Sequence, residues 1–238
     1  MKLSAEQIQS NWEEFHSNIK KYIKGDRQTQ LLAFYTKFQD RLVMMPASHK
    51  KEYHNAFPGG YIDHVNRVVR CAIKQYELWK EEGADITTFT VEELVFSAIN
   101  HDLGKLGEDY MHNKAIAFAA VPDRGLFLLQ QHDVKYTFNE MIAIQTHDGL
   151  YDSANEKYLK SYMPETKPRT SLPFILHQAD MMAARIEFEK EWLPKFKNNL
   201  EGQKSNFTLG TNSGKPNIKS KALGSIKSEG LKNIFDKL

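Results

Sequence analysis

Apolar residues recur at helical spacing along much of the chain, and this periodicity constrains the fold more than any other feature. In the first such stretch the apolar positions are separated by 4, 3, 4 and 3 residues, which places them on one face of a helix: Ile8, Trp12, Phe15, Ile19 and Tyr22. Ser4 followed by Gln7 forms a capping box just before this stripe. The pattern therefore predicts an amphipathic helix near the start of the chain.

The same signals recur further along. Capping boxes at Thr90/Glu93 and Thr137/Glu140 precede two more apolar stripes. We expect helices over about 4–22, 31–43, 61–80, 90–101, 124–131, 137–147 and 171–192. Residues 148–170, with two prolines, are typical of a surface loop, and 106–122 could form either a short strand or a buried loop. The sequence therefore predicts an all-α fold.

Charge and composition divide the chain into three parts. Residues 202–238 hold seven lysines against two acidic residues and are rich in Gly, Ser and Asn, whereas the whole chain carries a net charge of only +2. We therefore expect an N-terminal helix pair (1–46) packed on the core, a central domain (47–201), and a flexible basic tail (202–238) that ends in a short amphipathic peptide.

Composition also excludes several classes of protein. A hydrophobic fraction of 41% excludes wholesale disorder, and a single cysteine excludes an internal disulfide framework. Neither an apolar signal core nor a run of about 18 uncharged apolar residues is present. We expect a soluble cytoplasmic protein without a membrane segment.

Several histidines lie beside carboxylates at the ends of expected helices, and these residues indicate a candidate metal site. His64 lies in a first turn, and the pairs His101-Asp102 and His147-Asp148 end two helices. Asp180 lies inside a fourth helix among apolar neighbours, where a carboxylate is costly unless it is paired or binds a cation. Two imidazoles and two carboxylates suit a divalent ion and leave positions for water and a substrate oxygen.

Four motifs in this order resemble those of the HD-domain superfamily of metal-dependent phosphohydrolases. His54-Asn-Ala-Phe-Pro-Gly-Gly-Tyr-Ile-Asp-His64 resembles the HHxxPGGLLEH opening of the branch that includes HD-type 3′→5′ exonucleases. Asn-His101-Asp102-Leu-Gly-Lys105 resembles its LHDxGK motif, and Ile-Gln-Thr-His147-Asp-Gly resembles its late histidine motif. Leu-His177-Gln-Ala-Asp180, with Arg185 five residues later, resembles its closing LHxxDxxxAR. The four motifs span about residues 54–190.

The resemblance implies an HD-domain helical bundle and a set of roles for its residues. The implied ligands of the metal are His64, His101, Asp102 and Asp180. Lys105 and Arg185 are implied to bind a substrate phosphate and to support catalysis with Asp102, and His54 is implied to contact substrate. His147 is implied to be either a ligand of a second metal or the proton donor to the leaving group.

The number of metal ions is predicted from a difference between this sequence and the family pattern. Family members of this branch usually carry a glycine–histidine pair before the fifth helix, but residues 118–124 here read Phe-Ala-Ala-Val-Pro-Asp-Arg. This favours one divalent ion (Mn, Mg, Fe, Co or Ni) over two. It also disfavours the di-iron oxygenase chemistry of some HD-fold enzymes.

The resulting expectation is a phosphohydrolase that cleaves a phosphoester of a nucleotide or of single-stranded nucleic acid with metal-activated water. The alternative is an adaptor in which the basic tail and the terminal peptide, Leu231 to Leu238, bind a replication or transcription partner, with the helical core as a scaffold.

Overall fold

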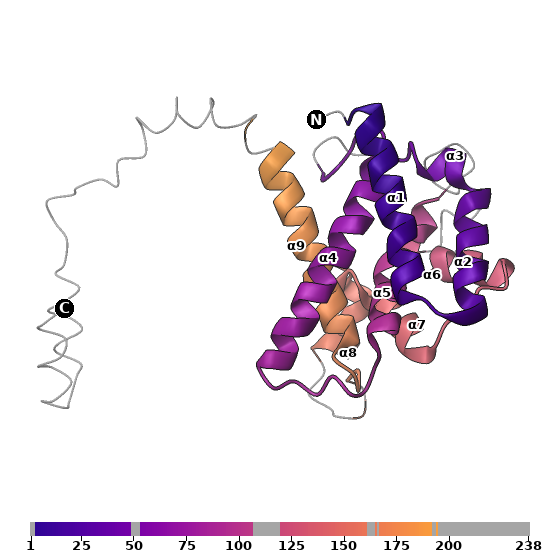
Figure 1. Ribbon diagram of the computed structural model, residues 1–238. Coiled ribbons are helices and arrows are strands. Elements are labelled where there is room, and N and C mark those ends of the chain that lie inside the picture. The colour runs from indigo at the N-terminus through magenta and orange to yellow at the C-terminus, as the bar shows by residue number, and fades with distance from the viewer. Residues whose placement is uncertain are drawn as a thin grey trace, which may run out of the picture. The chain divides into compact units, whose positions relative to one another are not determined.

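The computed structural model describes residues 3–48, 53–106, 120–160, 165, 167–191 and 194. These residues are mostly helical and contain no strand (Figure 1), so the all-α prediction is confirmed for the part of the chain described. None of the described helices is both long and apolar enough to cross a membrane. The basic tail and its terminal peptide, and most of 106–122, lie outside the described residues.

The helices follow one another in a simple order. The N-terminal part contains α1 (Ala5–Tyr22), α2 (Gly25–Lys37) and α3 (Gln39–Leu42). The middle contains α4 (Gly60–Glu81), α5 (Val91–Asn100), the 3-10 turn η1 (Leu103–Lys105), α6 (Val121–Gln131) and α7 (Phe138–Thr146). The last part contains two further 3-10 turns, η3 (Gly149–Tyr151) and η4 (Ser153–Asn155), followed by α8 (Glu156–Leu159) and α9 (Leu172–Glu191).

All three capping boxes form as the sequence predicts. The side chains of Ser4, Thr90 and Thr137 each accept a hydrogen bond from the backbone N–H three residues later. The side chain at that later position in turn accepts a hydrogen bond from the backbone N–H of the cap residue. These bonds satisfy backbone donors that have no partner inside the helix. The starts of α1, α5 and α7 are therefore fixed by local sequence.

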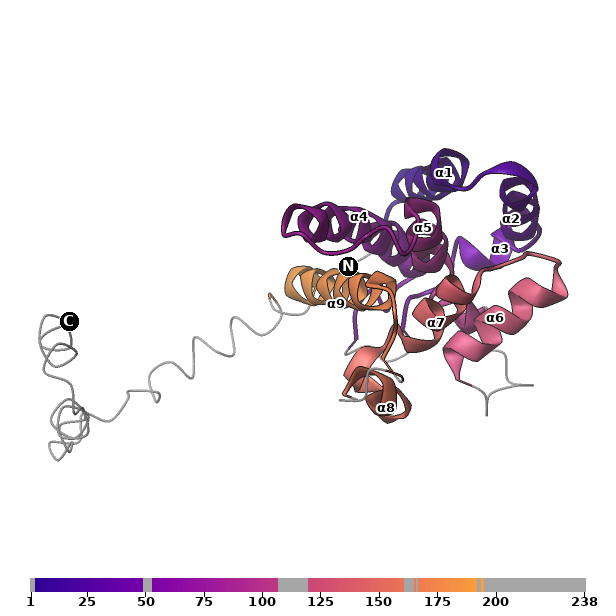
Figure 2. The same ribbon diagram turned by 90° about the horizontal axis from the view of Figure 1, so that it is seen from below.

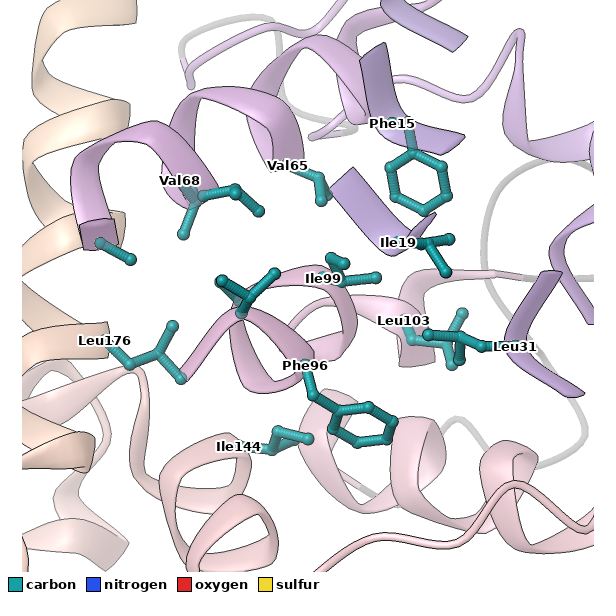
Figure 3. Packing of buried hydrophobic residues seen from close by; sticks show 14 of the residues in the cluster. Phe15, Ile19, Leu31, Val65, Val68, Phe96, Ile99, Leu103, Ile144 and Leu176 are labelled. Atoms are coloured by element: carbon teal, nitrogen blue, oxygen red, sulfur yellow. The ribbon is translucent and has the colours of Figure 1, made fainter. Parts of the chain in front are cut away.

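The helix α5 lies at the centre of the bundle. It packs against α1, α4, α7 and α9, and α4 and α9 lie side by side (Figures 1 and 2). Figure 3 shows how side chains from these helices meet: Phe15 and Ile19 of α1, Val65 and Val68 of α4, Phe96 and Ile99 of α5, Ile144 of α7 and Leu176 of α9. All of them are buried, so the N-terminal helix pair shares one core with the helices that carry the histidines.

Two expected elements differ from the structure. The stripe over 31–43 is divided, because the helix ends at Lys37 and a separate turn, α3, begins at Gln39. The expected loop at 148–170 contains η3, η4 and α8. These elements are single turns, which are too short to show an apolar period.

Candidate metal centre

The structure brings together the four residues expected to bind a metal. The Nε2 atom of His64 lies 3.1 Å from Asp180 Oδ1, and His101 Nε2 lies 3.5 Å from Asp102 Oδ2. The cross distances are 3.8 Å from His101 Nε2 to Asp180 Oδ1 and 3.9 Å from His64 Nε2 to Asp102 Oδ2. Bonds of about 2.0–2.2 Å place adjacent ligand atoms about 3 Å apart and opposite ones about 4 Å apart. All four distances fall within the range expected around one ion.

The turn before α4 places His64 in this cluster. Gly59 has φ +83°, and a Cβ atom on Gly60 would lie 2.1 Å from the backbone oxygen of Asn55. Only glycine permits this close approach and this conformation. As expected from the sequence, the glycine pair therefore allows α4 to begin directly against the turn, with His64 one helical turn later.

The hydrogen bonds of the rings show which nitrogen is free to bind a cation. Nδ1 of His101 lies 2.8 Å from the carbonyl oxygen of Ala98, and Nδ1 of His147 lies 2.7 Å from that of Ile144. Because a carbonyl oxygen only accepts, Nδ1 carries the proton in both rings. Nδ1 of His64 lies 3.0 Å from a carboxylate oxygen of Glu187. In each ring, Nε2 is left as the atom that faces the carboxylates, which is the arrangement found in histidine metal ligands.

Buried ring nitrogens without partners indicate that the cluster suits a cation. Within the described structure, Nε2 of His64 and Nε2 of His101 are buried and have no hydrogen-bond partner. A buried polar atom without a partner costs about 1–3 kcal/mol. A lone pair on such a nitrogen is also repelled by the carboxylate oxygen that it faces, and a proton or a divalent cation between them removes both penalties. The residues present therefore fit a metal ion with mixed nitrogen and oxygen ligands.

The electrostatics of the cluster keep its carboxylates ionised. Burial opposes ionisation of Asp102, but Lys105 and His101 outweigh it and hold the pKa of Asp102 well below its usual range. Burial likewise opposes ionisation of Asp180, and His64 and His101 lower its pKa. Burial opposes protonation of His64, but Glu187 and Asp180 raise its pKa to about 10. The accumulated negative charge thus attracts a proton or a metal ion to the same place.

Three further predicted residues lie beside the cluster. Lys105 Nζ donates a hydrogen bond to Asp102 Oδ2, and its side chain remains 20% exposed. His147 Nε2 lies 3.8 Å from Asp102 Oδ1. The ring of His54 lies 4.6 Å from that of His64, and its Nε2 has no hydrogen-bond partner among the residues that the structure describes. Burial together with the charge of His64 lowers the pKa of His54 to about 3.

Arg185 is not brought to the cluster, so the structure does not support the phosphate contact expected of it. Its side chain is 64% exposed, and its Nε donates to Glu189 Oε1 at 2.9 Å. Five residues correspond to about 500° of helix rotation, so Arg185 lies about 140° around α9 from Asp180. The sequence spacing alone was enough to show that the two side chains leave different faces. The apolar neighbours of Asp180 suggested that its side chain is fully buried, but it is 19% exposed.

The sequence analysis missed Glu187 and Arg67. Glu187 is buried on α9 and contacts His64 Nδ1 with one oxygen and Arg67 Nε, at 3.0 Å, with the other. It follows Asp180 by seven residues, about two helical turns, and so lies on the same face of α9. That spacing was the available signal that Glu187 lies near the cluster, although it does not identify His64 as its partner.

A histidine of α9 also holds the loop that follows His147. Nδ1 of His177 lies 2.8 Å from the carbonyl oxygen of His147. The next turn packs closely on this ring, because Gly149 has φ +56° and a Cβ atom there would lie 2.3 Å from His177 Cε1. His177 thus fixes the end of α7 against α9 and is not itself within the ligand set.

A separate cleft of about 910 Å³ lies along α7. Its lining includes Phe138, Ile142 and Gln145 on α7 and Tyr158 on α8, and none of the expected ligands. His147 leaves α7 on the face opposite to Phe138, because nine residues correspond to two and a half turns. The cleft is therefore distinct from the metal cluster.

Comparisons with protein-family models, with curated proteins and with solved structures found no match for this chain. The HD-domain assignment therefore stays an interpretation of four sequence motifs, and the function of the chain has to be inferred from its own residues.

Proposed function

We propose that this chain is a metal-dependent phosphohydrolase of the HD-domain type that acts on a phosphoester of a nucleotide or of single-stranded nucleic acid. One observation carries the proposal: buried imidazole Nε2 atoms of His64 and His101 converge on the ionised carboxylates of Asp102 and Asp180. These are the four residues that the sequence motifs name as ligands. Such a set of nitrogen and oxygen donors suits a divalent cation.

The four ligands come from three helical regions that are far apart in the sequence. His64 belongs to α4, His101 and Asp102 follow α5, and Asp180 belongs to α9. A divalent ion held by them supplies Lewis acidity, which lowers the pKa of water and polarises a phosphoryl oxygen. The protein contributes a fixed, largely buried set of donors, so little reorganisation is required during the reaction.

Residues beside the ligands account for binding of a phosphate. Lys105 supplies positive charge next to Asp102, with its pKa raised by that carboxylate against the effect of burial. Its part-exposed ammonium can reach a substrate oxygen while it holds Asp102. His54, neutral because of its low pKa, has an unsatisfied Nε2 beside His64 and can hydrogen-bond to substrate.

His147 has two roles that the same geometry permits. With Nδ1 bound to the carbonyl of Ile144, its Nε2 can bind the ion as a further ligand. In its protonated form, the same Nε2–H can donate a proton to a departing oxygen. A His147→Ala variant separates the roles, because loss of a ligand weakens metal binding whereas loss of an acid lowers turnover with the metal retained.

The test combines metal analysis with hydrolysis assays. Protein purified without chelator is analysed for bound metals, then assayed with Mn²⁺, Mg²⁺, Co²⁺ and Ni²⁺ against a panel of nucleotides and a short single-stranded oligonucleotide. We expect one metal per chain and phosphate or nucleotide release from one substrate class. The preferred class decides between a nucleotidase and an exonuclease.

Matched variants identify the site. Asp102→Ala is expected to lose metal and turnover together, whereas Asp40→Ala, which alters an exposed carboxylate that belongs to none of the candidate metal-binding groups, is expected to keep both. Full activity of Asp102→Ala, or a wild-type protein that binds none of the metals, would falsify the proposal.

A further inference from the structure

We propose that Glu187, held in place by Arg67, positions the metal ligand His64 by accepting the hydrogen of its Nδ1. This inference rests on the proposed metal centre but names a residue outside its ligand set. Glu187 touches neither Asp102 nor Asp180 in any described contact, so it acts through the imidazole.

Both oxygens of Glu187 are engaged, each by a different partner. Oε2 lies 3.0 Å from His64 Nδ1, and Oε1 lies 3.0 Å from Arg67 Nε. The side chain of Glu187 is 1% exposed and that of His64 is fully buried. Burial of a carboxylate at this depth is costly unless it is paired and hydrogen-bonded. Movement of Glu187 away from His64 or Arg67 would lose one of these bonds, so the two bonds fix its position.

His64 needs this partner because of its place in the helix. His101 and His147 stand at helix C-termini, where the carbonyls of Ala98 and Ile144, three residues earlier, are free to accept from Nδ1. His64 stands one turn into α4, where the preceding carbonyls already accept hydrogen bonds within the helix, and Gly60 O also accepts from Asn55 Nδ2. The acceptor for its Nδ1 must come from another element.

The helix α9 supplies it from the face that also carries a ligand. Asp180 and Glu187 are seven residues apart, and α9 lies beside α4 (Figures 1 and 2). The Asp180 carboxylate faces Nε2 of His64 and the Glu187 carboxylate faces Nδ1. One helix thus fixes both nitrogens of one ring, which determines the tautomer and the direction of the Nε2 lone pair.

A chain of polar contacts holds Arg67 in turn. Arg67 Nη2 lies 3.7 Å from Asp63 Oδ2. The same carboxylate accepts from Asn55 Nδ2 at 2.8 Å and from Asn11 Nδ2 at 3.3 Å. Glu187 is therefore connected, through Arg67 and Asp63 of α4, to Asn55 in the turn before α4 and to Asn11 of α1.

Glu187→Gln is a sharp perturbation because it keeps the shape and removes one acceptor. If the amide oxygen faces Arg67, the amide nitrogen faces His64 and favours the tautomer with the hydrogen on Nε2, which cannot bind a metal. Loss of such an outer partner weakens metal binding by roughly 10–100-fold. Glu189→Gln is the matched control, because Glu189 lies on the same helix, is half-exposed and pairs with Arg185.

The experiment measures Mn²⁺ affinity by titration calorimetry on the full chain, with circular dichroism to establish that each variant is folded. We expect Glu187→Gln to bind Mn²⁺ roughly 10–100-fold more weakly than wild type, and Glu189→Gln to bind as wild type does. A folded Glu187→Gln variant with wild-type affinity overturns the inference and leaves the proposed function intact. A wild-type protein that binds no metal defeats the proposed function instead.

A second measurement does not depend on a variant that folds. In wild-type protein loaded with diamagnetic Zn²⁺, imidazole ¹H–¹⁵N spectra are expected to show His64 with its hydrogen on Nδ1, protected from exchange. A purely structural Glu187 would not fix this signature. A His64 ring whose Nδ1 carries no hydrogen, or exchanges it freely with water, overturns the inference.

Discussion

Replacement of Gly60 by alanine should separate the geometry of the metal centre from the stability of the protein. A Cβ atom at this position would lie 2.1 Å from the backbone oxygen of Asn55 and 3.0 Å from its carbonyl carbon. Ordinary contact begins at 3.4 Å, so the turn and the start of α4 must separate by about 1.3 Å. The clash is with backbone and cannot be relieved by rotation of a side chain.

The shift is large on the scale of the site. His64 lies one helical turn after Gly60, and its Nε2 is 3.1 Å from Asp180 Oδ1. A functional constellation tolerates errors of about 0.5 Å, so a displacement of about 1 Å should weaken metal binding by at least roughly tenfold. Crowding of this kind also lowers the free energy of unfolding by about 1–3 kcal/mol.

Gly83→Ala provides the control. Gly83 has φ +85°, and a Cβ atom there would have no heavy atom within 4 Å, so alanine is strained at this position without a clash. It should cost about 1–2 kcal/mol of unfolding free energy and leave the metal centre intact. Urea denaturation with chelator gives the stabilities, and Mn²⁺ titration gives the affinities. The reasoning is refuted if Gly60→Ala binds Mn²⁺ as tightly as Gly83→Ala does.

Protonation, metal binding and substrate contact at the same site can each be tested. In the presence of chelator, the free energy of unfolding should fall as pH rises from 6.5 to 10, because the pKa of His64 is raised from 6.5 to about 10 and the folded state loses its extra proton across that window. Urea denaturation at several pH values measures this, and a free energy of unfolding that rises with pH would contradict it. Addition of Mn²⁺ at about 100 times its Kd should stabilise the protein by about 2.7 kcal/mol, and an unchanged Tm would show that the ion does not prefer the folded state. Tyr151, which is 81% exposed four residues after His147 and contacts the His177 ring, should stack on a base of the substrate. Tyr151→Ala should therefore raise KM by several-fold to about tenfold with kcat retained, Tyr151→Phe should restore it, and an unchanged KM would remove Tyr151 from the substrate site.

Local sequence signals predicted the helices well, and their failures have local causes. The capping boxes of Ser4, Thr90 and Thr137 each involve residues three apart, so no tertiary information is needed to identify them. By contrast, Phe38 interrupts the stripe over 31–43 although its apolar spacing continues. Apolar spacing records which face is buried and does not record a break in the helical hydrogen bonds.

The sequence motifs and their order along the chain predicted the four candidate metal ligands, but not every residue around them. His64, His101, Asp102 and Asp180 were expected together from their motifs, and in the structure each imidazole Nε2 lies within 3.9 Å of both carboxylates. Arg185 was expected from its motif alone, and rotation around α9 takes it away from the cluster. Glu187 could not be assigned to His64 from the sequence, because that pairing depends on the relative position of α4 and α9.

The histidines of the site illustrate two ways in which a sequence can orient an imidazole. At a helix C-terminus, the free carbonyl three residues earlier fixes the tautomer, so the short motifs that contain His101 and His147 are sufficient for the local geometry. At a helix N-terminus no such carbonyl is free, and His64 depends on a glutamate 123 residues away in the sequence. Orientation of His64 is therefore a tertiary property, which can form only after α9 has packed against α4. It follows that mutations which loosen the α4–α9 contact should affect the metal through His64 and through Asp180, which α9 carries, before they affect His101 or His147.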